Sequence, residues 1–190
     1  MKVIHLISGG DSGGAKTHVL SLLQHLNQTI TAQLVCFRDG PFAEEARQMG
    51  IPTMICGGNN VFRTRRKLAA YIREGGYEII HCHGSRANMI GAMLRKVTGL
   101  PVVTTVHSDY KLDYMGRPFA RLTFGAINAW ALRHLDYRIG VSDAMVDLLI
   151  DRGFPPDRFY AIYNGIDFTP APSQGDRLAY LRGLGADVEE

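Results

Sequence analysis

Four glycines near the start of the chain are the first residues whose spacing could carry chemistry. Gly9, Gly10, Gly13 and Gly14 stand between a short apolar run and an amphipathic stretch. Glycine lets the backbone approach a ligand because no Cβ intervenes, and a helix that begins there directs free N–H groups and its positive dipole end at the same place. The pattern predicts a site for an anion, most often a phosphate or diphosphate. The alternative is an ordinary strand-to-helix turn without a ligand.

Two familiar phosphate-binding motifs do not fit this stretch. A P-loop requires glycine, four residues and then Gly-Lys-Ser/Thr. Gly9 and Gly14 have that spacing, but Ala15 precedes Lys16 and Thr17. The extra residue turns the lysine by about 100° around a helix. The dinucleotide pattern Gly-x-Gly-x-x-Gly is absent as well, so the predicted anion site follows neither motif.

Three histidines stand at the ends of apolar runs further along the chain. His81 and His83 are two residues apart, so both can face the same side of a strand. Two histidines are an incomplete metal site, and we expect one of them to line a cleft. His107 directly follows a run rich in β-branched residues. Its simplest interpretation is a residue that only ends a strand.

Other polar side chains are expected on loops at the edge of the same cleft or at a helix start. Tyrosine stacks on sugars, and lysine or arginine can hold a phosphate. The loops could also be merely solvated, and a serine before a helix could be a plain N-cap. These candidates are Arg86, Asp109, Tyr110, Lys111 and Ser142.

Segments typical of strands and of helices alternate along the chain. Short runs of apolar and β-branched residues predict strands, and an apolar period near 3.6 predicts helices. The predicted strands cover residues 3–7, 31–37, 52–56, 78–82, 102–106, 136–141 and 158–163. The predicted helices cover residues 15–26, 42–49, 62–74, 87–97, 119–135 and 144–152.

This alternation predicts an α/β fold. Strands separated by helix-length segments form right-handed βαβ units, so we expect a Rossmann-like, doubly wound parallel sheet of about seven strands with helices on both faces. Ligands bind such sheets at the carboxyl ends of the strands, near the switch in strand order. The glycine cluster, His83 and His107 should therefore lie along one edge.

Length, charge and cysteine usage narrow the class of protein. The 190 residues suit one domain, and the net charge of +3 is too small to indicate nucleic-acid binding. The three cysteines lie far apart, as expected of buried free thiols in a reducing compartment. No apolar run is long enough to cross a bilayer. We therefore expect a cytoplasmic protein.

The predicted helix from Arg63 to Arg73 is strongly basic. Its exposed side is either a solvated face or a docking face for an anionic membrane.

Three segments of the chain are contiguous motifs. They are Gly13-Gly-Ala-Lys-Thr-His-Val19, Val102-Val-Thr-Thr-Val-His107, and Ile139-Gly-Val-Ser142 with Tyr163-Asn-Gly-Ile-Asp167 downstream. Together they resemble the N-terminal half of the GT-B glycosyltransferases of family four, also called group 1. The likeness covers residues 1 to about 185, and the last pair of segments is the most specific.

The resemblance implies half of a two-domain enzyme. In this family two Rossmann-like domains face each other, the N-terminal one mainly binding the acceptor and the C-terminal one the nucleotide-sugar donor. Transfer retains the anomeric configuration and uses no metal or other cofactor. Residues 1–168 would then be the acceptor-binding domain. Residues 169–190 would be a linker and the start of a missing donor-binding domain, and this fragment alone would be inactive.

The resemblance also gives single residues expected roles. Gly13 and Gly14 would close over the donor diphosphate and sugar, where backbone amides suit a leaving group that gains negative charge. His107 would lie beside the transferred sugar as the catalytic residue and donate a hydrogen bond or orient the acceptor. His83, Arg86, Asp109, Tyr110, Lys111 and Ser142 would be candidates for binding the acceptor.

The expected function is thus a step in cell-envelope polysaccharide or glycolipid synthesis. Its expected partners are a nucleotide sugar and a sugar, lipid-linked or phosphorylated acceptor, with peripheral contact at the inner face of the membrane. Two alternatives stay open. One is an enzyme of the same architecture, similar to a nucleotide-sugar epimerase, and the other is a non-catalytic module that binds a nucleotide or phosphate.

Overall fold

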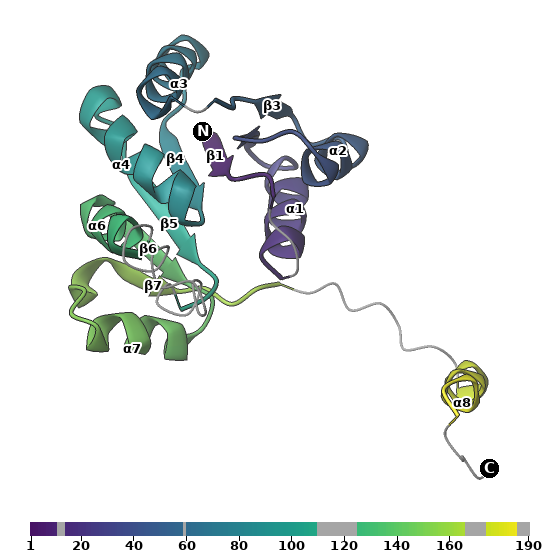
Figure 1. Cartoon of the computed structure of the whole chain (residues 1–190). Coiled ribbons are helices and arrows are strands. Elements are labelled where there is room, and N and C mark those ends of the chain that lie inside the picture. The colour runs from purple at the N-terminus through teal and green to yellow at the C-terminus, as the bar shows by residue number, and fades with distance from the viewer. Residues whose placement is uncertain (11–13, 59, 110–124, 166–173, 186–190) are drawn as a thin grey trace.

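The computed structural model describes residues 1–10, 14–58, 60–109, 125–165 and 174–185, the side chains of residues 174–178 excepted. Seven strands in this part of the chain form one parallel sheet (Figure 1). The strands are β1 (Lys2–Ile7), β2 (Thr31–Cys36), β3 (Thr53–Ile55), β4 (Ile79–His83), β5 (Val102–Val106), β6 (Tyr137–Gly140) and β7 (Phe159–Ala161). The predicted α/β fold with about seven parallel strands is confirmed.

The order of the strands in the sheet is β3-β2-β1-β4-β5-β6-β7. The chain moves outward from β1 to β3 and then returns to place β4 on the other side of β1. In the β1–β4 pair, His5 is in register with His81 and Ile7 with His83. The order reverses between β1 and β4, which is where ligands bind open α/β sheets.

Helices cover both faces of the sheet, as predicted (Figure 1). One apolar core lies under α1 and α2, and the other under α3, α4 and α6. The helices are α1 (Gly14–Leu26), α2 (Pro41–Gln48), α3 (Val61–Gly75), α4 (Ser85–Thr98), α6 (Ala126–His134), α7 (Asp143–Asp151) and α8 (Gln174–Gly183).

The predicted helix at residues 119–135 can be compared with the structure over its second part alone. Helix α6 begins at Ala126, directly after Gly125, and residues 119–124 lie outside the described part of the chain. The division into residues 1–168 and 169–190 stays a prediction. Among the described residues, no helix is both long and apolar enough to span a bilayer.

Candidate functional site

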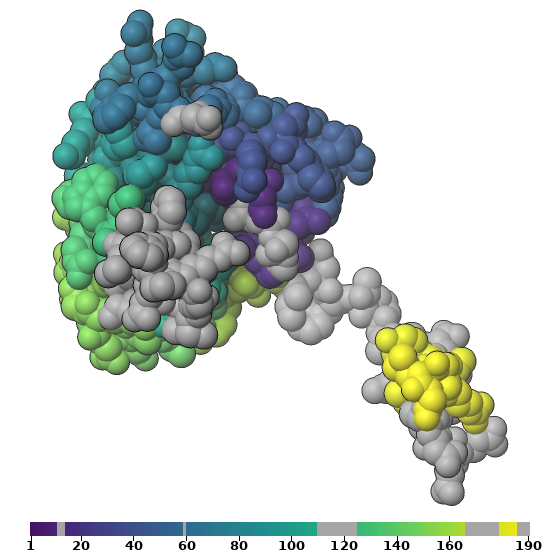
Figure 2. Space-filling model, in the orientation of Figure 1, coloured from purple at the N-terminus to yellow at the C-terminus, as the bar shows by residue number. Residues whose placement is uncertain are grey.

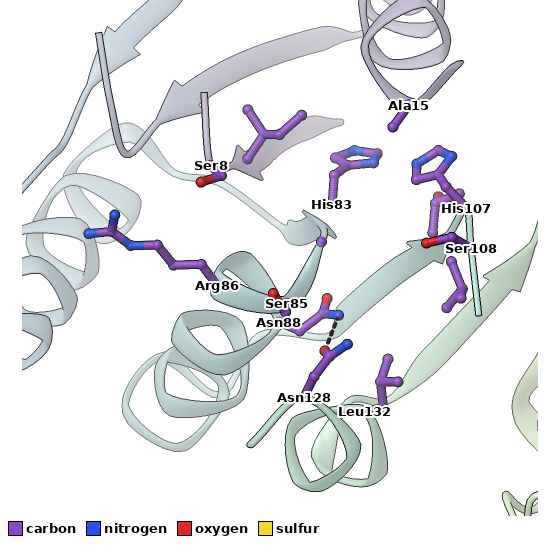
Figure 3. A pocket seen from close by; sticks show the side chains of 14 residues that line it. Ser8, Ala15, His83, Ser85, Arg86, Asn88, His107, Ser108, Asn128 and Leu132 are labelled. Atoms are coloured by element: carbon purple, nitrogen blue, oxygen red, sulfur yellow. Dashed lines mark hydrogen bonds between the residues drawn. The ribbon is translucent and has the colours of Figure 1, made fainter. Parts of the chain in front are cut away.

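A pocket with a volume of about 330 Å³ opens at the carboxyl ends of β1, β4 and β5 (Figure 3). The first turns of α1 and α4 contribute to its walls, together with α6. It therefore lies at the switch in strand order, where the sequence predicted the site. The polar side chains on its walls belong to Ser8, Ser85, Arg86, His83, Asn88, Thr105, His107, Ser108 and Asn128, and none of the described lining residues is acidic.

The glycine cluster divides into two kinds of position. Gly9 has a φ of +85°, and a Cβ there would collide with the backbone carbonyl oxygen of Arg38. Gly14 begins α1, and a Cβ there would meet no atom of the described residues within 4 Å. Gly13 lies outside the described residues. The packing of the chain thus requires glycine at position 9, whereas the described residues leave room for a side chain at position 14.

His107 and His83 place two imidazoles on one side of the pocket, next to Ala15 (Figure 3). Their ring centres are 5.9 Å apart, and His18 of α1 approaches His107 edge-on at 4.9 Å. Burial, with the nearby His18, lowers the pKa of His107 to about 4. The ring is neutral at ordinary pH, so one of its nitrogens can donate a hydrogen bond and the other can accept one.

The two histidines of the pocket belong to a larger group that the sequence analysis missed. Five of the seven histidines in the chain gather there, contributed by β1, α1, β4 and the residue after β5. Burial lowers the pKa of His5 to about 3, and burial with neighbouring imidazoles holds the pKa values of His81 and His83 well below 6.5. His5 and His18 had no local signal, because only the strand order brings them to His83.

A buried chain of hydrogen bonds supports the opposite wall of the pocket. The Thr104 hydroxyl donates to Asn88 Oδ1 at 2.6 Å, and Asn88 Nδ2 donates to Asn128 Oδ1 at 3.0 Å (Figure 3). The chain joins β5, α4 and α6 and fixes the carboxamide of Asn128 at the pocket. The sequence analysis missed both asparagines, since each appears there as an ordinary helix residue.

Arg86 lies at the far end of the pocket and turns away from the histidines (Figure 3). Its Nη2 donates to the carbonyl oxygen of Gly58 at 3.0 Å, and its guanidinium lies 5.3 Å from the centre of the Phe37 ring. These contacts hold the side chain in place at the rim. Arg86 and His83 are therefore the two predicted acceptor-binding residues that line the pocket.

The other predicted residues have different surroundings. The carboxylate of Asp109 forms an ion pair with both terminal guanidinium nitrogens of Arg152, at the end of α7. The Ser142 hydroxyl accepts a hydrogen bond from the Met145 N–H at 3.2 Å and is an N-cap of α7. Neither lines the pocket. Tyr110 and Lys111 lie outside the described residues.

Known proteins share both the sequence pattern and the fold. An α-1,3-galactosyltransferase of Escherichia coli, which acts on α-D-GlcNAc-diphosphoundecaprenol with UDP-Gal, is 24% identical over 178 residues, covering 83% of this chain and 43% of that protein. An α-maltose-1-phosphate synthase of Mycolicibacterium smegmatis is 27% identical over 192 residues, covering 93% and 47%. The chain thus spans about half the length of the curated relatives it matches.

Solved structures show the same fold. The crystal structure of HepE from Anabaena with UDP superposes with a TM-score of 0.78 at 20% identity, covering 97% of this chain and 50% of that one. The lipopolysaccharide outer core galactosyltransferase WaaB matches with a TM-score of 0.63 at 16% identity, covering 92% and 50%. The model of Glycosyltransferase Family 4 matches residues 12–169. The chain therefore belongs to Glycosyltransferase Family 4, and it has the fold of an N-terminal domain of a GT-B enzyme.

Proposed function

We propose that this chain is the acceptor-binding half of a retaining glycosyltransferase that uses a nucleotide-sugar donor. The observation that carries the proposal is the pocket at the β1–β4 switch, with neutral His107 beside the first turn of α1. HepE was crystallised with UDP and with UDP-glucose, which supports a nucleotide sugar as the donor.

The proposed chemistry assigns separate tasks to the two sides of the pocket. The leaving diphosphate gains negative charge in the transition state, and the amides at the start of α1, from Gly14 onward, would stabilise that charge. The neutral ring of His107 would donate a hydrogen bond to a hydroxyl of the transferred sugar. His83 and Arg86 would contact the acceptor. The transfer step itself would need no metal and no other cofactor.

The proposed acceptor is a sugar, either lipid-linked or phosphorylated, in the synthesis of a cell-envelope polysaccharide or glycolipid. The E. coli relative acts on a sugar linked to diphosphoundecaprenol, which supports a lipid-linked acceptor for this chain. The volume of about 330 Å³ lies within the range of small-molecule sites. The pocket would thus hold the terminal sugar.

Purified residues 1–190 are expected to fold but to transfer no sugar, because the donor would be bound by a second domain. Circular dichroism tests the fold, and release of nucleotide from UDP-sugars in the presence of candidate acceptors tests transfer. The control is a protein in which the same residues are followed by a donor-binding domain. Turnover by residues 1–190 alone would contradict the proposal. An epimerised nucleotide sugar from the longer protein would favour the epimerase, and nucleotide binding without turnover would favour a binding module.

Helix α3 is the surface that would contact a membrane. It lies at one end of the molecule with its side chains projecting outward (Figure 2). Arg63, Arg66, Lys67 and Arg73 are exposed, and Phe62 is 67% exposed among them. Basic residues around an exposed aromatic ring suit an interface with anionic lipid. We propose peripheral binding to the inner face of the membrane through α3.

Reversing the charge of Arg63 and Arg66 together, as R63E/R66E, is expected to weaken binding to vesicles that contain anionic lipid by about tenfold or more, since each basic residue near the surface adds about 1 kcal/mol. Co-sedimentation with vesicles measures this. The matched control is Lys96→Glu, an exposed lysine on α4, and vesicles of uncharged lipid are a second control. Equal binding by R63E/R66E and the parent chain would show that α3 is merely a solvated face.

A further inference from the structure

Three buried histidines face one another on one side of the sheet, beneath the pocket. His5 lies in register with His81 on the neighbouring strand, and His83 follows two residues later on the same face. The ring centres of His5 and His81 are 4.7 Å apart, and those of His81 and His83 are 4.4 Å apart. All three side chains are more than nine-tenths buried. The sequence offered only His81 and His83, an incomplete ligand set, and the fold adds a third imidazole.

The hydrogen bonding of this group is incomplete in a specific way. His5 Nδ1 and His83 Nε2 are 3.1 Å apart, so one ring donates to the other. The second nitrogens of both rings, His5 Nε2 and His83 Nδ1, are buried with no hydrogen-bond partner among the described residues. If both rings are neutral, the ring that donates this hydrogen bond has no proton on its second nitrogen. The ring that accepts it has an N–H at its second nitrogen, and that N–H has no partner among the described residues. A metal ion between the rings would replace the hydrogen bond between His5 Nδ1 and His83 Nε2 by two metal–nitrogen bonds, and the outer nitrogen of each ring would then carry the proton.

We propose that His5, His81 and His83 form a binding site for a divalent first-row transition-metal ion, with Zn²⁺ as the foremost candidate. Imidazole nitrogen suits zinc, copper and nickel, whereas magnesium, calcium and manganese prefer oxygen ligands. No described carboxylate or thiol belongs to the group. Three histidines with an open fourth position are an established ligand set for zinc. The ion would join β1 to β4, and it has no step in the proposed sugar transfer.

The spacing of the three residues is close to what zinc requires. Tetrahedral Zn–N bonds of about 2.0–2.1 Å place two ligand nitrogens about 3.4 Å apart. The contact between His5 and His83 already has a length of 3.1 Å, and the ligand atoms of all three residues lie within 4.8 Å of one another. The last side-chain torsion of histidine has a broad preference. Rotation of the rings can therefore close the remaining gap without moving the strands.

A hydrogen bond fixes the orientation of the His81 ring. Thr105 Oγ1 lies 2.8 Å from His81 Nε2 and can accept a hydrogen bond from its N–H, which leaves Nδ1 of that ring as the ligand. His83 and Thr105 also line the pocket, so an ion has a path to the site.

The test is a zinc titration of the untagged chain after treatment with a chelator and dialysis. Isothermal calorimetry with ZnCl₂ is expected to give one ion per chain with a Kd on the order of 1 µM or tighter. Zinc should also raise the melting temperature, since a ligand that binds the folded state stabilises it. His5→Gln and His81→Gln should each weaken zinc binding at least about tenfold. Neither readout depends on enzyme activity.

The matched controls are His25→Gln on α1 and His134→Gln on α6, both exposed and remote from the three ligands. Their zinc affinity should equal that of the parent chain. Since a polar replacement of His5 could prevent folding, Thr105→Val provides a second test that keeps all three ligands. Removing the partner of His81 should weaken zinc binding about tenfold with an unchanged circular dichroism spectrum. The proposal is overturned by absent binding at about 100 µM zinc, by unchanged affinity in T105V, or by loss of binding in either control.

Discussion

Replacing His107 by alanine, in a protein that carries this domain and its donor-binding partner, is expected to lower turnover about a hundredfold, the lower range for a positioned acid, base or hydrogen-bond donor. The ring lines the pocket beside the start of α1. Its Nε2 is buried and has no hydrogen-bond partner among the described residues. The fold should survive, because His107 follows β5 and does not belong to either apolar core.

The measurement is turnover at saturating donor and acceptor, with circular dichroism as the folding control. His134→Ala is the matched variant, because His134 is exposed on α6 and lies outside the pocket. It should have the turnover of the parent protein. Turnover of H107A within about twofold of the parent, far short of the expected loss, would show that His107 only ends a strand.

Gly14→Val in the same two-domain protein is expected to lower turnover about a hundredfold and to leave the melting temperature nearly unchanged. A Cβ at position 14 meets no atom of the described residues within 4 Å, so the folded domain can accept the side chain. The same open space is where the donor diphosphate would approach the amides of α1, and loss of one such electrostatic contact costs about a hundredfold or more. Turnover and thermal melting measure the two effects separately.

Gly9→Ala is the contrasting variant, and the opposite result is expected. Its Cβ would collide with the Arg38 carbonyl, and its φ of +85° is strained for any residue with a side chain. We expect a loss of at least about 2 kcal/mol in the free energy of unfolding. If G14V instead unfolds and keeps its activity per folded molecule, the turn at position 14 is structural and the proposed donor loop is wrong.

The sequence by itself determined the class of fold and the edge at which a ligand would bind. Apolar runs that alternate with amphipathic stretches specify parallel strands and their covering helices, because burial on two faces favours apolar residues at most strand positions. All seven predicted strands are present, and His83 and His107 lie at the predicted edge. The family could also be recognised from the sequence, because each of its motifs is contiguous in the chain.

Only the tertiary structure decided which side chains meet. The neighbour of β1 on each side is set by how the whole sheet packs, and no local pattern records it. Placing β4 beside β1 brings His5 within hydrogen-bonding distance of His83, although the two residues are 78 positions apart in the chain. The same packing brings α1 over the sheet and His18 to His107, and it joins Asn88 to Asn128. The sequence does not distinguish Gly9 from Gly14 either. In the fold, the carbonyl oxygen of Arg38, which follows β2, leaves no room for a Cβ at position 9.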